Sequence, residues 1–169
     1  MKQLVILITL LVCCDSALAC TCKFFTTTEH YSRATEVFRA RVESVDIVPV
    51  PKRLVGVHFL MPSAREWKGR TRTVVRARFK LLETYKGSPQ LLEAVYTSNS
   101  SSCRLNIYDG EEYVFFAETQ GIVGFCGGNT RVWPDDERFK DTIKSLKRLA
   151  SELLDHEKGP AAPESRSSE

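Results

Sequence analysis

The sequence of 169 residues predicts a mainly β fold: a small barrel of five strands, with a short helix before it and an amphipathic helix after it. Three observations support this prediction. Short runs of alternating apolar and polar residues, bounded by turn residues, recur through the middle of the chain. No helical pattern separates these runs, as it would in a parallel sheet. One clear helical period follows the last run, and this combination is typical of small, closed or partly open barrels.

The chain begins with the features of a secretory signal peptide. Lys2 supplies a positive start, residues 4–12 form an unbroken apolar run, and Ala17 and Ala19 satisfy the small-residue rule for cleavage. The apolar run is shorter than the roughly 20 residues that a membrane span needs. We therefore expect a secreted protein that begins at Cys20 and does not insert into a membrane.

The predicted organisation has three parts. They are a leader at 1–19, one folded domain at 20–158 that includes the C-terminal helix, and a disordered tail at 159–169. The alternative is a bacterial lipoprotein acylated at Cys20, although Ala17 lies where such sites usually carry a branched apolar residue.

Four of the six cysteines remain after removal of the leader, and in an oxidising compartment they predict two disulfides. They are Cys20, Cys22, Cys103 and Cys126. A bond between Cys20 and Cys22 is disfavoured, because the single residue between them would strain the disulfide geometry. Two connectivities remain, and both join the early pair to the late pair. Each bridge would close a loop of more than 80 residues, which the chain-entropy model values at roughly 4 to 5 kcal/mol.

The first half of the domain predicts a short helix and one strand. Threonines at 26–28 followed by Glu29 offer N-caps for a helix that turns Tyr31 and Ala34 inward. Alternation then places Phe38, Ala40 and Val42 on one side of a strand, and Arg39, Arg41 and Glu43 on the other. The continuation at 45–50 meets prolines and should leave the sheet or run along its edge. Residues 51–68 are interpreted as a long excursion whose apolar residues either fold back onto the core or form a binding arm.

The second half predicts four further strands and the closing helix. The strands are expected at 73–85, 91–96, 113–117 and 122–126, with a polar loop at 97–102 and turns at 86–89 and 108–111. Asp135 or Asp136 can cap the helix, and Gly159 with Pro160 ends it. Its apolar stripe consists of Phe139, Ile143, Leu146, Ala150 and Leu153. We expect this stripe to pack on the barrel, because acidic and basic residues share the outer face.

Charge and motifs exclude several classes of function. A net charge of +3 with mixed signs does not approach the basic patches of nucleic-acid binders. Arg76, Arg78 and Lys80 are interpreted as the solvated face of a strand, with a matrix polysaccharide contact as the alternative. The histidines, His30, His58 and His156, lack paired ligand spacing and are interpreted as ordinary surface or loop residues.

An enzyme is not predicted. Serines at 100–102 lack the context of a nucleophile elbow, and the chain has no glycine-rich phosphate loop. We therefore predict no catalytic residues and no metal or cofactor of the protein's own.

Several motifs together resemble the N-terminal domain of the tissue inhibitors of metalloproteinases, which belongs to the netrin-like group of OB-type barrels. The residues that carry the resemblance are Cys20-Thr21-Cys22, Ser101-Ser102-Cys103, the run Asp-Gly-Glu-Glu-Tyr-Val-Phe-Phe-Ala at 109–117, Cys126 and Trp133. The similarity extends from Cys20 to about Pro134. By resemblance, the two bridges are Cys20–Cys103 and Cys22–Cys126.

The chain also departs from the family pattern. A third early cysteine of the family falls on Ser32 here, and its usual partner after Trp133 is missing too, so one whole bridge is lost. The second subdomain of longer members is replaced by the helix and the tail, which puts binding to an enzyme's accessory domains in doubt.

The resemblance implies an inhibitor whose first residue binds the zinc of a target enzyme. The backbone amine and carbonyl of Cys20 would chelate that zinc, which belongs to the proteinase, and Thr21 would enter its specificity pocket. The inhibitory ridge would comprise Thr21, Cys22, Lys23, Ser101, Ser102 and Cys103. The expected partners of this monomer are secreted or membrane-bound zinc metalloproteinases, and the extracellular matrix.

Two further expectations accompany this interpretation. Asn99 begins an Asn-Ser-Ser sequon, so a glycan there would lie beside the ridge. Netrin-like barrels also serve as extracellular modules that bind matrix or signalling ligands without inhibiting a protease, and fold alone does not decide between these uses.

Overall fold

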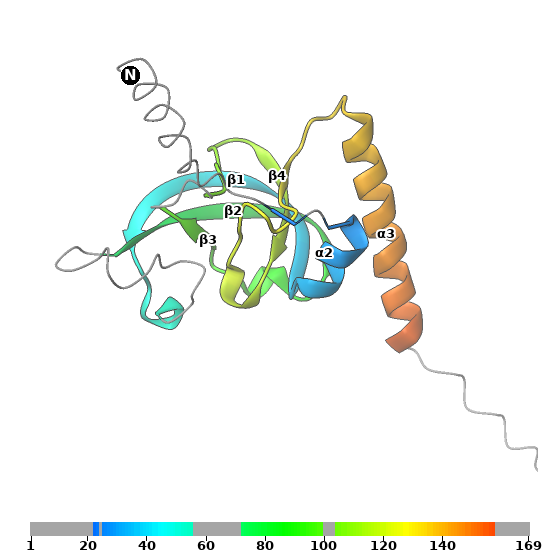
Figure 1. The fold of residues 1–169 in the computed structure, drawn as a ribbon, viewed down its shortest axis with the longest axis horizontal. Helices are drawn as coiled ribbons and strands as arrows, with labels where there is room; N and C mark the ends of the chain where they lie inside the picture. Colours follow the sequence, from blue (N-terminus) through cyan, green and yellow to red (C-terminus); the bar gives the residue numbers. More distant parts are fainter. Residues whose placement is uncertain (1–21, 24, 56–71, 100–103, 158–169) are drawn as a thin grey trace, which may run out of the picture.

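The computed structural model describes residues 22–23, 25–55, 72–99 and 104–157. The strands are β1 (Glu36–Pro49), β2 (Thr73–Lys86), β3 (Val95–Ser98), β4 (Glu112–Ala117) and β5 (Thr130–Arg131). The helices are α2 (Thr27–Arg33) and α3 (Glu137–Glu157), with 3₁₀ turns η1 (Lys52–Leu54), η4 (Pro89–Leu91) and η5 (Thr119–Gly121). The strands form one antiparallel sheet in the order β3-β2-β1-β4-β5 (Figure 1). The predicted mainly β fold with two flanking helices is confirmed.

The two long strands, β1 and β2, organise the sheet. They pair over nearly their whole length, from Val37 with Lys86 to Pro49 with Thr73. β4 pairs only with the first half of β1, up to Arg41. Within the described residues, the second half of β1 therefore runs along an edge, which is one of the two outcomes that its prolines predicted.

Both faces of the sheet bury apolar side chains, because alternate residues point to opposite faces. One face carries the main core, with Phe38, Ala40, Val42, Ala77, Val95, Tyr113 and Phe115 among its members. The opposite face is apolar only at its two ends. One end packs against α2 and α3 through Val37, Tyr85, Val114 and Phe116, and the other contains Leu54, Val74, Tyr96 and Ile122.

The predicted bounds of the third strand were wrong. Pro89 and Leu91 belong to η4, whose turn is closed by a bond from the Leu91 N–H to the Ser88 carbonyl at 3.0 Å. β3 starts at Val95 and includes two residues that had been assigned to a polar loop. Thr97 pairs with Val75 and Ser98 with Val74, and both side chains are buried.

The predicted fifth strand at 122–126 was also wrong. Ile122 makes only single bridges, to Tyr96 and to Glu118, and residues 125–128 form a turn. The actual β5 is two residues long and pairs with Tyr113 and Val114 of β4. β3 and β5 are the outer strands, and the described residues form an open sheet, not a closed barrel.

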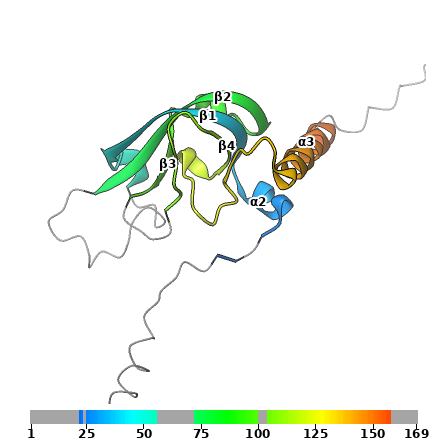
Figure 2. The same cartoon turned by 90° about the horizontal axis from the view of Figure 1, so that it is seen from above.

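The two helices lie beside each other at one end of the sheet (Figures 1 and 2). Asp136 accepts a hydrogen bond from the Arg138 N–H at 2.9 Å, as expected for the cap of α3. Leu146 is fully buried, and Phe139, Ile143 and Ala150 pack beside it, which confirms most of the predicted stripe. Leu153 is 39% exposed and does not belong to the buried part. Within the described ranges, neither helix is long and apolar enough to cross a membrane.

Candidate functional site

A disulfide anchors the N-terminal segment, defined here as Cys22, Lys23 and Phe25. It joins Cys22 to Cys126 across 104 positions of sequence, with the two Cα atoms 5.4 Å apart. This is one of the two expected bridges. The other expected bridge, Cys20–Cys103, and the ridge residues Thr21, Ser101 and Ser102 lie outside the described residues.

The partner cysteine lies in residues 124–128, called the Cys126 loop below. Asn129 fixes this loop to β4, because its Oδ1 accepts from the Phe116 N–H and its Nδ2 donates to the Gly124 carbonyl, both at 2.8 Å. A turn within the loop is closed by a bond from the Gly127 N–H to the same carbonyl at 3.0 Å. The anchor of the N-terminal segment is therefore attached to the central sheet by side-chain and backbone hydrogen bonds.

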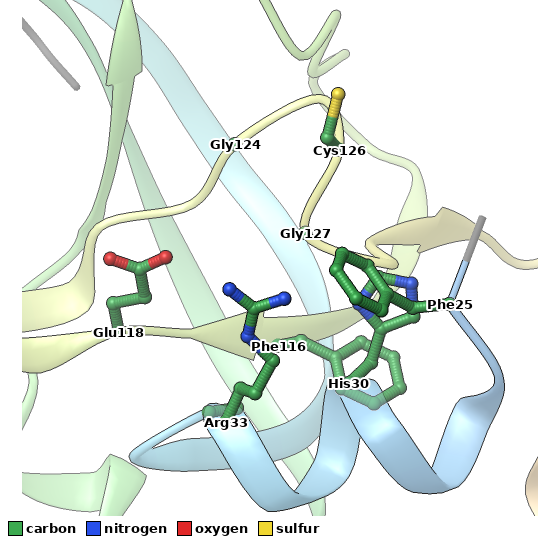
Figure 3. A pocket seen from close by; sticks show the side chains of 9 residues that line it. Phe25, His30, Arg33, Phe116, Glu118, Gly124, Cys126 and Gly127 are labelled. Atoms are coloured by element: carbon green, nitrogen blue, oxygen red, sulfur yellow. The ribbon is translucent and has the colours of Figure 1, made fainter. Parts of the chain in front are cut away.

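His30 of α2 fills the space between the N-terminal segment, β4 and the Cys126 loop (Figure 3). Its ring lies edge-on to Phe25, at 5.5 Å between centroids, and tilted to Phe116 at 5.8 Å. It also touches the backbone of Gly128, where a Cβ would lie 2.6 Å from the imidazole Cγ. A glycine is required here for this contact and for its φ of +82°.

A cavity of about 220 Å³ opens beside His30. Its walls come from Phe25, His30, Arg33, Ala34, Phe116, Glu118, Gly124, Cys126 and Gly127. Arg33 and Glu118 project into it from α2 and from the end of β4 (Figure 3). Burial lowers the pKa of the His30 imidazole, and the Arg33 charge lowers it further against the opposing effect of Glu29. His30 packs between two aromatic rings at the cavity, so its interpretation as an ordinary surface or loop histidine was wrong.

Polar contacts attach α2 to the end of β2. The Tyr31 hydroxyl donates to the Tyr85 carbonyl at 2.7 Å. The Lys86 ammonium donates to the carbonyls of Tyr31 at 2.8 Å, Ala34 at 2.7 Å and Ser32 at 3.3 Å. Burial lowers the pKa of Lys86, although the Glu36 charge opposes this. A cation at the C-terminus of a helix also complements its dipole, so this lysine closes α2 against the sheet.

Two other predicted site residues are described. Lys23 is exposed, with its ammonium 5.3 Å from the centroid of the Phe25 ring. Asn99 is half-buried just after β3, and its Nδ2 donates to the Thr73 hydroxyl at 3.0 Å. The nitrogen that would carry a glycan is therefore held against the start of β2.

A charged surface lies between the two apolar ends of the sheet's opposite face. Arg39 and Arg41 both bind Glu112, at 2.6 and 2.5 Å, and Arg76 binds Asp46 at 3.1 Å. Burial alone would raise the pKa of Glu112. The hydrogen bonds and charges of Arg39 and Arg41 outweigh burial, and the pKa of Glu112 is lowered.

Arg78 and Lys80 continue the same row along β2. Both side chains are exposed, and neither forms an ion pair within the described part of the chain. The solvated face predicted for Arg76, Arg78 and Lys80 is present at the last two, where it carries an excess of positive charge. The prediction was wrong for Arg76, whose side chain is only 22% exposed and is paired with Asp46.

Sequence comparison adds no assignment to this site. No protein-family model matches the chain, and a search of curated proteins found no match. Among the described residues, no three His, Cys, Asp or Glu side chains gather closely enough to hold a metal ion. The chemistry of the site is therefore argued from its own residues.

Proposed function

We propose that the protein is a secreted inhibitor of zinc metalloproteinases, similar to the tissue inhibitors, and that its first mature residue is Cys20. A catalytic zinc has three protein ligands and one open position. The free amine and the carbonyl oxygen of an N-terminal residue can occupy that position as a five-membered chelate and displace the bound water. The zinc belongs to the proteinase, and the inhibitor supplies only backbone atoms of Cys20.

The Cys22–Cys126 disulfide is the observation that carries this proposal. It fixes the residue two positions after Cys20 to a loop that Asn129 holds on the sheet. A terminus that is ordered before binding loses less conformational entropy in the complex, and this gain appears as affinity. The expected second bridge, Cys20–Cys103, would restrain the chelating residue itself and bring the Ser101 and Ser102 ridge beside it.

The fold proposed for this inhibitor is a netrin-like barrel of the OB type. The bridges of Ile122 to Tyr96 of β3 and to Glu118 after β4 support it. Through them Ile122 contacts both the outer strand β3 and the residue that follows β4, the kind of contact that a closing barrel would need.

An added N-terminal residue tests the proposed chelate. Refolded protein beginning at Cys20 should inhibit a panel of zinc metalloproteinases, whereas a version with one extra alanine should lose inhibition, because its amine no longer lies beside the Cys20 carbonyl. Inhibition should also weaken as pH falls below about 7.7 to 8.0, where an α-amine becomes protonated. Circular dichroism and the free-thiol content control for correct folding of both versions.

The Thr21→Gly variant separates the chelate from the specificity pocket. It should weaken inhibition without changing the unfolding midpoint, because it removes a side chain proposed to enter the enzyme. Equal inhibition by the processed and alanine-extended proteins would contradict the chelate. An unchanged inhibition constant for Thr21→Gly would contradict only the role of Thr21.

The charged sheet face favours a second candidate, an extracellular module that binds anionic matrix polysaccharide. Arg78 and Lys80 are exposed cations that no carboxylate neutralises in the described part of the chain. Binding to immobilised heparin should then weaken with salt and fall in the double variant Arg78→Ser, Lys80→Ser. A double variant at Lys140 and Lys144 of α3 is the matched control for charge, and an equal loss there would show nonspecific attraction.

A further inference from the structure

His30 lies where three separate parts of the chain meet. Phe25 belongs to the N-terminal segment, Phe116 to β4 and Gly128 to the Cys126 loop, and the imidazole contacts all three. The disulfide joins the segment to the loop covalently, but it allows rotation about several single bonds. The ring of His30 adds a noncovalent contact to the segment, because it packs against Phe25 (Figure 3).

Arg33, one turn further along α2, disfavours a positive charge on the His30 ring. Its guanidinium lies 4.4 Å from the centroid of the Phe25 ring, and the Lys23 ammonium lies 5.3 Å from the same centroid on the N-terminal segment. Glu29 on α2 is the nearest opposing charge along the helix, but its carboxylate accepts the Thr26 N–H at 2.7 Å and the Thr26 hydroxyl at 2.9 Å. Glu118 faces the cavity from the end of β4, and the Cys126 loop contributes no titratable side chain.

We propose that protonation of His30 releases Phe25 from its packing, so that the N-terminal segment is fixed at neutral pH and loosened in acid while the disulfide keeps it tethered. A charged imidazole favours hydration over a place between two phenyl rings, a glycine backbone and nearby cations. The effect on inhibition rests on the proposed function, because a loosened segment would present Cys20 to a proteinase with less order.

The direction of the effect follows from proton linkage. The side chain released into water titrates near its ordinary pKa of about 6.5, whereas in the packed state burial and Arg33 lower the pKa. The released state therefore binds more protons at mildly acidic pH. Packing is complete above about pH 6.5, the pKa of the released side chain. It weakens as the pH falls from there to the pKa of the packed state, and below that pKa it weakens no further.

Nuclear magnetic resonance and hydrogen exchange on the processed protein test this proposal without a proteinase. The His30 ring protons should titrate below about pH 6.5, and the Phe25 ring resonances should shift with the same midpoint. After correction for intrinsic rates, protection of the Thr26, Phe116 and Gly127 amides should fall severalfold between about pH 7.5 and about pH 5. Amides of β1 and β2 should keep their protection over this range.

Variants identify the titrating group. His30→Phe keeps an aromatic ring that cannot be protonated, and should abolish the pH dependence while keeping protection at neutral pH. His156→Gln, which removes a histidine from α3, should behave as the wild type. A His30 midpoint at or above about 6.5, or the same loss of protection in His30→Phe, would overturn the proposal. The wild-type titration decides the question even if His30→Phe packs poorly, and neither result depends on whether Cys20 binds zinc.

Discussion

The two helices cover the same end of the sheet, but they are attached by different means. α3 has 21 residues and packs through an apolar stripe in which Leu146 is fully buried. α2 has seven residues and buries one of them, Tyr31. It is attached by the Tyr31 hydroxyl, by the Lys86 ammonium, by a capping box at Thr26 and, through the adjacent segment, by the Cys22–Cys126 disulfide.

The difference shows how helix length decides the kind of attachment. Nucleating a helix is unfavourable, and a helix shorter than about 12 residues has too few internal hydrogen bonds to offset that cost. α3 offsets the cost of nucleation by burying apolar side chains along its long stripe. α2 has room for only two turns, so specific polar contacts at each end must hold it. Substitutions should therefore affect α3 through lost volume and α2 through lost hydrogen bonds.

The largest effect is expected at the centre of the α3 stripe. Leu146→Ala should lower the free energy of unfolding by about 2–5 kcal/mol, because it removes buried methyl groups and leaves a cavity. Urea denaturation measures this loss. The adjacent variant Lys147→Met is the control, since it removes only an ion pair to Glu83 at 3.1 Å between partly exposed groups, expected to cost less than about 1 kcal/mol. Equal losses in both variants would mean that α3 is held by charge.

A smaller effect is expected where Lys86 closes α2. Lys86→Met should cost about 1–3 kcal/mol, because it leaves the Tyr31 and Ala34 carbonyls without their donor while keeping the aliphatic volume. Hydrogen exchange should show the loss first in α2 and the N-terminal segment. Lys80→Met on the same strand is the matched control, since Lys80 is exposed and makes no ion pair within the described residues. If α3 amides lost protection before α2 amides, the assigned role of Lys86 would be wrong.

Periodicity predicted the parts of the fold in which burial follows a regular pattern. The alternation of Phe38, Ala40 and Val42 placed one face of β1 correctly, and the helical spacing of Phe139, Ile143 and Leu146 placed α3. The errors occur where no periodic pattern exists. A strand of two residues such as β5 has no period, and the apolar run at 122–126 resembles a strand although only Ile122 forms bridges and the run ends in a turn.

Of the candidate site, the sequence predicted only the disulfide. Spacing restricted the cysteines to bridges between the early and late pairs, and the resemblance then specified Cys22–Cys126, which the structure contains. The contacts of Lys86 with α2, and of His30 and Asn129 with Phe116, join different elements of the fold, so no local pattern reveals them. The Gly127-Gly128-Asn129 triplet after Cys126 was the available indication, since it combines a flexible backbone with an amide that can bind the backbone.

The smallest effect is expected at the start of α2. The Thr26 hydroxyl accepts the Glu29 N–H at 3.2 Å, while the Glu29 carboxylate accepts the Thr26 N–H at 2.7 Å. Thr26→Ala removes the first of these bonds and the bond from the Thr26 hydroxyl to the Glu29 carboxylate at 2.9 Å. It should cost about 1 kcal/mol, the usual value for a lost N-cap. Urea denaturation measures the loss of global stability, and hydrogen exchange of the α2 amides measures the loss within the helix. Comparing the two shows whether the loss is local or global.

The control for this cap lies two residues further along the same helix. Thr28 is exposed, and its hydroxyl makes no hydrogen bond within the described residues. Thr28→Ala should therefore leave stability unchanged or raise it slightly, because alanine has the higher helix propensity. A loss at Thr28 equal to that at Thr26 would contradict the cap, because Thr28 makes no such bond and propensity alone favours alanine. A loss confined to Thr26 would confirm that α2 depends on polar contacts at its start, as it does on Lys86 at its end.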